Sequence, residues 1–139
     1  LGGTGAANKL DDYEEGTFAA TLTADTAPSS AQTQTCSYTK VGNLVTVFIR
    51  FTNKNTAGAS GAMKITGLPF TSNNVVENQS SVPMMHNLTI SEKYVTGYIT
   101  GNTTVINFIN NRNNAAWTIT QINASSGVYL NMNMSYQSA

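Results

Sequence analysis

The sequence contains little charge, one cysteine, one histidine and one tryptophan. Charged residues make up 10% of the chain and balance to a formal net charge of zero, whereas soluble domains average about 25% charged residues. A neutral chain without a basic patch does not favour nucleic-acid binding. The single cysteine, Cys36, excludes an internal disulfide, and we expect it to be a small buried side chain.

Long apolar runs and helical periodicity are also missing. No apolar run approaches the about 20 residues that a membrane span requires, so we expect no membrane insertion. The sequence has no phosphate-binding loop, no nucleophile–base pair and no well-spaced pair of acids. We therefore expect neither enzymatic activity nor a cofactor. We expect the lone His86 to be a strand or loop residue satisfied by hydrogen bonds, because a zinc site needs several ligands.

Short alternating runs rich in threonine dominate the chain, and turns rich in asparagine, serine and glycine separate them. This pattern predicts about eight to ten short strands in an antiparallel β-sandwich or jelly roll. Residues 1–9 are expected to form a linker or extended arm from a preceding shaft, and residues 10–139 a single β-sandwich domain. The predicted strands are residues 17–23, 34–42, 44–51, 62–66, 82–90, 94–100, 104–109, 116–122 and 128–136.

Alternation assigns the faces of two of these strands. Residues 44–51 have two largely apolar faces, which indicates a central strand. Residues 128–136 have one apolar face, made of Val128, Leu130, Met132, Met134 and Tyr136. Their opposite face is polar and consists of Tyr129, Asn131, Asn133 and Ser135. We expect the apolar face of residues 128–136 to lie in the core or along a seam between subunits.

Four of the seven carboxylates stand together around one tyrosine in the stretch "DDYEE". A calcium loop would need acids at alternating positions, and a glycosidase needs two carboxyl groups about 5–10 Å apart on either side of a sugar. The stretch has neither arrangement, so we expect no metal site. The acids are expected to face solvent or to form pairs between subunits where the domain begins. These residues are Asp11, Asp12, Tyr13, Glu14 and Glu15.

The only tryptophan follows an asparagine-rich loop that also contains an arginine. An aromatic ring, side-chain amides and a guanidinium together can bind a sugar, because the ring packs against C–H groups while the polar groups bond hydroxyls. The alternative is a core tryptophan in the sandwich. The candidate carbohydrate-binding residues are Trp117, Arg112, Asn113 and Asn114, with Tyr94, Tyr98 and Tyr129 as secondary candidates.

Three motifs in the first half of the chain carry a family resemblance. The segments "NKLDDYEEGTF", "YTKVGNLVTV" and "ITGLPF", in this order, resemble a domain at the distal ends of phage tail fibres and tailspikes. In that family the first motif typically reads like "LDDYEEGTWTP". Here Phe18 replaces the common tryptophan and "AAT" replaces the usual "TPT". We expect Leu10, Tyr13 and Phe18 to anchor this first motif to the core. The second half of the chain is similar to this family only in its general pattern, which is a run of short strands.

The resemblance implies a β-sandwich at a fibre tip, on the tail of the virion and outside the cell. Such a domain is usually a homotrimer and recognises bacterial surface polysaccharide or lipopolysaccharide without catalysis. The same resemblance is compatible with a structural module that trimerises and caps the fibre without receptor contact. A monomeric carbohydrate-binding module of a secreted protein fits the composition but not the "LDDYEEGT" motif.

Overall fold

The computed structural model describes residues 12–74, 84–90, 95–110, 118–119, 122 and 125–139. Every described element is a strand, which confirms the all-β prediction, and the described residues form no helix that could cross a membrane. The expected arm, residues 1–9, lies outside the described residues. The strands are β1 (Tyr13–Thr23), β2 (Gln32–Val41), β3 (Leu44–Lys54), β4 (Lys64–Thr66), β5 (Met84–His86), β6 (Val95–Ile99), β7 (Val105–Asn110), β8 (Thr118–Ile119) and β9 (Val128–Gln137).

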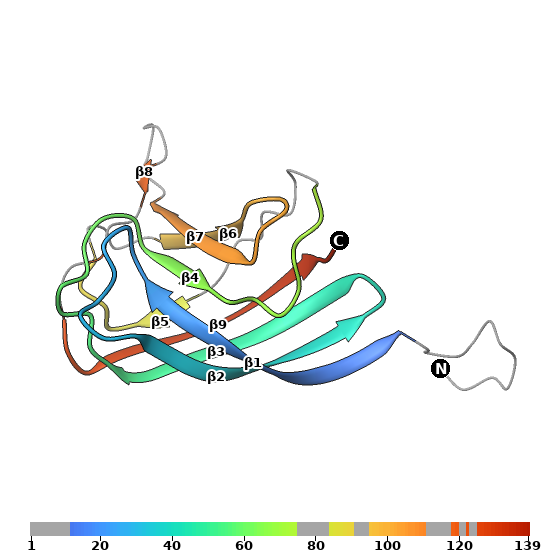
Figure 1. Cartoon of the computed structure of the whole chain (residues 1–139), viewed down its shortest axis with the longest axis horizontal. Helices are drawn as coiled ribbons and strands as arrows, with labels where there is room; N and C mark the ends of the chain where they lie inside the picture. Colours follow the sequence, from blue (N-terminus) through green and yellow to red (C-terminus); the bar gives the residue numbers. More distant parts are fainter. Residues whose placement is uncertain (1–11, 75–83, 91–94, 111–117, 120–121, 123–124) are drawn as a thin grey trace, which may run out of the picture.

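The strands form one antiparallel sheet that is nearly closed into a barrel. Its order is β5-β9-β3-β2-β1-β4-β7-β6, and β8 pairs with β7. In Figure 1, β5, β9, β3, β2 and the first part of β1 form a lower layer, and β4, β7 and β6 form an upper layer. The two layers are continuous because β1 pairs along its length with β2 and, through Thr21–Thr23, with β4. The predicted antiparallel sandwich is therefore built from one curled sheet.

The first strand begins earlier than its sequence pattern suggests. The alternating run predicts a start at Thr17, whereas β1 starts at Tyr13. The reason is pairing across the sheet, since Tyr13 lies opposite Val41 and Glu14 lies opposite Lys40. Tertiary pairing thus extends the strand through a stretch of acids with low intrinsic strand preference.

The turn between β2 and β3 agrees with the sequence. The pair Gly42-Asn43, a combination typical of tight turns, joins them, and Gly42 has a φ of +59°. A left-handed φ of this kind is accessible to glycine at little steric cost.

The core lies between the two layers. The predicted apolar face of residues 128–136 is buried in it, Met132 and Met134 included, and Cys36 is also buried, as expected. On β3, one face from Val45 to Phe51 is buried, and the strand is central, between β2 and β9. On the other face of β3, Leu44 and Phe48 are both exposed.

Tyr136 joins the last strand to the connection after β4. Its hydroxyl donates a hydrogen bond to the carbonyl oxygen of Phe70 at 2.9 Å and lies 3.3 Å from the amide nitrogen of Phe70. Burial raises the pKa of Tyr136 to about 12. An unfolded tyrosine has a pKa of about 10, so the fold favours the neutral phenol.

This pKa predicts a loss of stability at high pH. The stabilisation linked to Tyr136 is complete below about pH 10 and disappears as the pH rises to about 12, because only the unfolded chain ionises within that window. The shift corresponds to about 2–3 kcal/mol. Urea unfolding from pH 9 to 12 should therefore be less pH-dependent in Tyr136→Phe than in the wild type. If the free energy of unfolding fell equally with pH in the variant and the wild type, the assignment to Tyr136 would be contradicted.

Candidate functional site

One face of the lower layer points away from the core, and we call it the outer face. Side chains alternate along each strand, so the residues between the buried positions of β1, β2, β3, β9 and β5 lie on it. Every large hydrophobic side chain that is exposed among the described residues is there: Tyr13, Val41, Leu44, Phe48, Met85 and Tyr129. A monomeric protein rarely exposes so many apolar side chains on one face without a binding role.

The register of the strands brings polar side chains together around Phe48. One cross-strand row consists of Thr17, Ser37, Phe48 and Asn133. The adjacent row contains Arg50, Asn131 and Met85. These seven residues line an open depression of about 920 Å³, which we call the outer groove. Phe48 is 51% exposed, so much of its surface is free to meet a ligand.

Hydrogen bonding distinguishes the outer groove from the rest of the outer face. On one side of it, Thr46 and Ser135 bond each other at 2.8 Å. On the other side, Thr21 and Thr33 bond each other at 2.9 Å. Within the described part of the chain, no side-chain hydrogen bond connects the groove's own polar groups: Thr17, Ser37, Arg50, Asn131 and Asn133. The groove therefore presents donors and acceptors that are available to a ligand.

This combination of groups suits a sugar. Residues two apart on a strand lie roughly 7 Å apart, and neighbouring strands lie about 5 Å apart, so Phe48, Arg50, Asn131 and Asn133 surround a patch the size of a sugar ring. The ring of Phe48 offers an apolar surface, and the amides of Asn131 and Asn133 offer both donors and acceptors. Sites with an apolar surface and a few oriented polar groups are typical of ligand binding.

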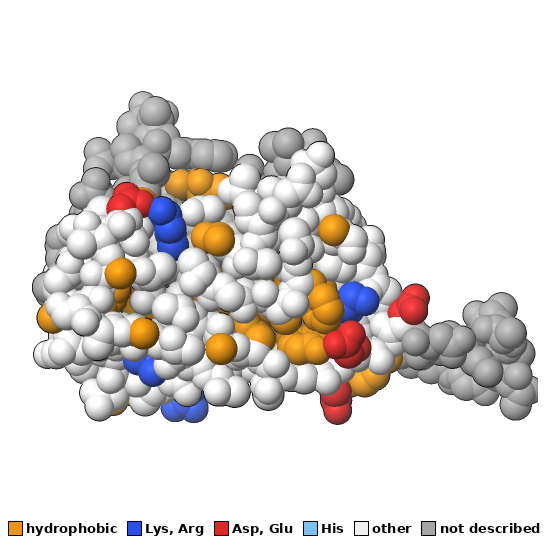
Figure 2. Space-filling model, in the orientation of Figure 1, with side chains coloured by type: hydrophobic (Ala, Val, Ile, Leu, Met, Phe, Trp, Pro, Cys, Tyr) orange, Lys and Arg blue, Asp and Glu red, His pale blue; other side chains and the backbone are white. Residues whose placement is uncertain are grey.

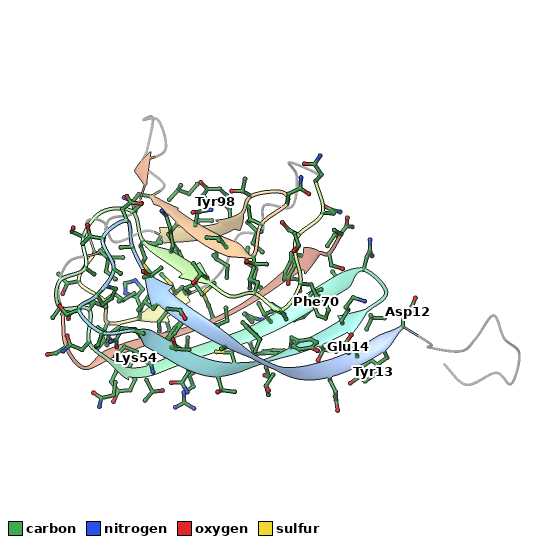
Figure 3. All side chains as sticks on the ribbon, viewed as in Figure 1. Asp12, Tyr13, Glu14, Lys54, Phe70 and Tyr98 are labelled. Carbon is green, nitrogen blue, oxygen red and sulfur yellow. The ribbon has the colours of Figure 1, made fainter. Side chains whose placement is uncertain are left out.

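The residues predicted from sequence as a sugar site are not in this groove. Trp117, Arg112, Asn113, Asn114 and Tyr94 lie outside the described residues. Tyr98 lies on β6 and is half-buried. Figure 3 places Tyr98 on the upper layer, on the opposite side of the molecule from the labelled Lys54 and Tyr13 of the lower layer. The structure therefore does not bring Tyr98 to the outer groove.

Two acids of the acidic stretch, Glu14 and Glu15, accept hydrogen bonds from tyrosines of the chain. Asp11 lies outside the described residues, and Asp12 is exposed. Tyr13 donates a hydrogen bond to Glu15 at 2.7 Å, and this bond raises the pKa of Tyr13. Tyr38 donates to Glu14, and this bond raises the pKa of Tyr38. Figure 2 shows these acids gathered near the start of β1. In the described part of the chain, no three potential ligands gather as a metal site.

The prediction that Tyr13 anchors this stretch to the core is wrong. Tyr13 is 49% exposed and pairs with Val41 on the outer face, because strand alternation directs the neighbouring Glu14 and not Tyr13 toward the inner side. Phe18 does pack against the core, as expected. Leu10, the other expected anchor, lies outside the described residues.

The three family-like motifs meet in space on the inner side of β1 and β2. The ring of Tyr38, from the second motif, lies 6.5 Å from that of Phe18 in the first motif and 5.2 Å from that of Phe70 in the third. The ammonium of Lys40 lies 5.4 Å from the centre of the Phe70 ring. Figure 3 shows Phe70 beside Glu14 at this end of the sheet. The motifs thus form one aromatic cluster that holds the connection after β4 against β1 and β2.

The half-buried His86 and the buried Cys36 are not arranged for catalysis. His86 lies on β5, and its Nδ1 is buried with no hydrogen-bond partner in the structure. The expectation of a fully satisfied histidine is therefore wrong, and burial lowers the pKa of His86, which favours the neutral ring. Burial raises the pKa of the Cys36 thiol, which makes it a poor nucleophile at neutral pH.

Comparison with known protein families finds no match, and comparison with curated proteins finds none either.

Proposed function

We propose that this chain is a non-catalytic carbohydrate-binding domain, and specifically the receptor-binding tip domain of a phage tail fibre or tailspike. The observation that carries the binding proposal is the outer groove, where Phe48 is exposed among polar side chains that form no side-chain hydrogen bond with another described residue. The phage assignment is supported by the resemblance of the three motifs, which form a single aromatic cluster. The ligand would be a bacterial surface polysaccharide or lipopolysaccharide.

A shallow site of this kind binds weakly, and repetition on a fibre would strengthen it. Linked copies convert later binding events into intramolecular ones, which raises the overall affinity without any new contact. We propose a homotrimer for this reason, so that three outer grooves engage one repetitive polymer. The family resemblance also supports a homotrimer.

Replacing Phe48 with alanine should weaken glycan binding about tenfold or more while the fold remains intact, because exposed aromatic anchors dominate binding energy. The measurement is equilibrium binding to a panel of immobilised bacterial surface polysaccharides. The matched control is Tyr129→Ala, which removes another aromatic from the outer face. Tyr129 is 47% exposed and does not line the outer groove. Equal binding by Phe48→Ala and the wild type would refute the groove as the site.

A structural role is the second candidate. Tyr13, Val41 and Leu44 form a cross-strand row of exposed apolar side chains at one end of the outer face, and such a row suits contact between subunits. Deleting the domain from its parent fibre distinguishes the two roles. A structural module would be required for trimers, whereas a receptor-binding domain would be required only for adsorption.

A further inference from the structure

Arg50 differs from the other described cations because its side chain has no partner among the described residues. Lys64 forms an ion pair with Asp25 at 2.6 Å. The ammonium of Lys54 donates to the carbonyl oxygen of Thr33 at 2.7 Å, and Lys40 lies over the ring of Phe70. For Arg50, the described residues offer no carboxylate, carbonyl or aromatic partner to its side chain. None of its five N–H donors is used by a described side chain or carbonyl, so they are available to a ligand.

Among the described residues, no carboxylate compensates the charge of Arg50. Arg50 is the one charged residue among those that line the outer groove. Three described carboxylates are engaged elsewhere: Glu14 by Tyr38, Glu15 by Tyr13, and Asp25 by Lys64. A groove with one unpaired guanidinium and otherwise neutral lining favours a ligand with one negative charge.

We infer that the glycan bound in the outer groove is acidic and that a sugar carboxylate pairs with the guanidinium of Arg50. This inference rests on the proposed function and names the class of its ligand. A guanidinium presents two parallel N–H groups that match the two oxygens of a carboxylate. A carboxylate also matches the single charge of Arg50, whereas a phosphomonoester carries about −1.5 to −2 at neutral pH.

The neighbours of Arg50 complete the arrangement. Phe48 is two residues away on the same face of β3, and Asn131 lies directly opposite Arg50 on β9. With the carboxylate on Arg50, the apolar side of the sugar ring lies toward Phe48. The amides of Asn131 and Asn133 are then placed to bond the ring hydroxyls. Arg50 thus selects the charge of the ligand, and Phe48 supplies the apolar contact.

The test compares each polysaccharide with a neutral form of itself. A panel of uronate-containing bacterial capsular polysaccharides is used in native form and after chemical reduction of the carboxylates to alcohols. We expect the wild type to bind native polymers at least about tenfold more tightly than reduced ones, since a hydrogen bond to a charged group contributes about 1.5–3 kcal/mol. Arg50→Gln should abolish this preference. Arg50→Lys should retain part of it, because lysine keeps the positive charge but lacks the two parallel N–H groups of the guanidinium.

The matched control is Lys54→Gln, which removes one positive charge from the same strand but outside the residues that line the groove. It should keep the preference for native polymers. Dextran sulfate tests for binding to any polyanion. Equal weakening by Arg50→Gln and Lys54→Gln, or tight binding of dextran sulfate, would overturn the inference in favour of nonspecific charge attraction.

The failures of the two proposals are distinguishable. If neutral or carboxyl-reduced polymers bind as well as native ones and Phe48→Ala weakens both, the inference fails but the proposed function stands. If no native or reduced polymer binds, both fail. Thermal unfolding of Arg50→Gln and Arg50→Lys establishes that the variants are folded, which is expected for an exposed side chain.

Discussion

Replacing Phe51 with alanine should lower the free energy of unfolding by about 3–5 kcal/mol. Phe51 is fully buried in the core and lies opposite Leu130 on β9. Truncating it removes apolar contacts and leaves a cavity that the strands on either side cannot close, since β3 is held between β2 and β9. Because domains are stable by only about 5–15 kcal/mol, this is a large share of the total. Urea unfolding measures it directly.

The control for this variant is Phe48→Ala on the same strand. Phe48 is the same residue type but lies on the outer face, where its removal leaves no cavity, so we expect a cost below about 1 kcal/mol. Together the two variants separate stability from binding: the Phe51 variant should lose stability, and the Phe48 variant should lose glycan affinity. Equal destabilisation by both would show that the faces of β3 are assigned wrongly.

Replacing Gly67 with alanine is the second change with a large expected effect. Gly67 follows β4 with a φ of +88°, and a Cβ atom there would lie 2.4 Å from the carbonyl oxygen of Ala19 on β1. The left-handed conformation costs about 1–3 kcal/mol for a residue other than glycine. The steric conflict with the backbone adds about 1–3 kcal/mol. We expect a total loss of about 2–6 kcal/mol in the free energy of unfolding.

Gly42→Ala is the matched control for this position. Gly42 also has a positive φ, +59°, but an added Cβ there would meet nothing within 4 Å. It should show only the conformational part of the cost. If Gly42→Ala destabilises the protein as much as Gly67→Ala does, close packing of β1 against Gly67 is not the cause. Thermal or urea unfolding of the two variants, compared under one condition, decides this.

The strands were predictable because their alternation survives in the fold. Residues 128–136 show this best, since the apolar side chains from Val128 to Tyr136 are buried and the intervening ones face outward. Strand ends were less predictable. The start of β1 depends on pairing with Val41, and the end of β3 continues past Phe51 through an irregularity opposite β9. Such extensions come from the neighbouring strand and leave no local pattern.

The candidate site could be predicted only in pieces. Alternation places Phe48 and Arg50 on one face of their strand, and Asn131 and Asn133 on one face of theirs. What unites them is the pairing of β3 with β9 in one register. A shift of this register by one residue would move every side chain of β9 to the opposite face of the sheet. The sequence carries no local sign of this register. The sequence alone therefore points to Trp117, where an aromatic side chain and amides are neighbours along the chain.

The central place of β9 has a consequence for how the chain reaches this fold. β9 is the last described strand, yet it lies between β3 and β5, and its ladder with β3 joins Thr46 to Ser135 across 89 residues. Closing so long a loop costs entropy before any contact repays it, and folding of such topologies is slow. During synthesis, β3 exposes an unpaired edge until residues 128–137 have left the ribosome. A nascent chain with this edge is prone to pair with its neighbours on the same polysome.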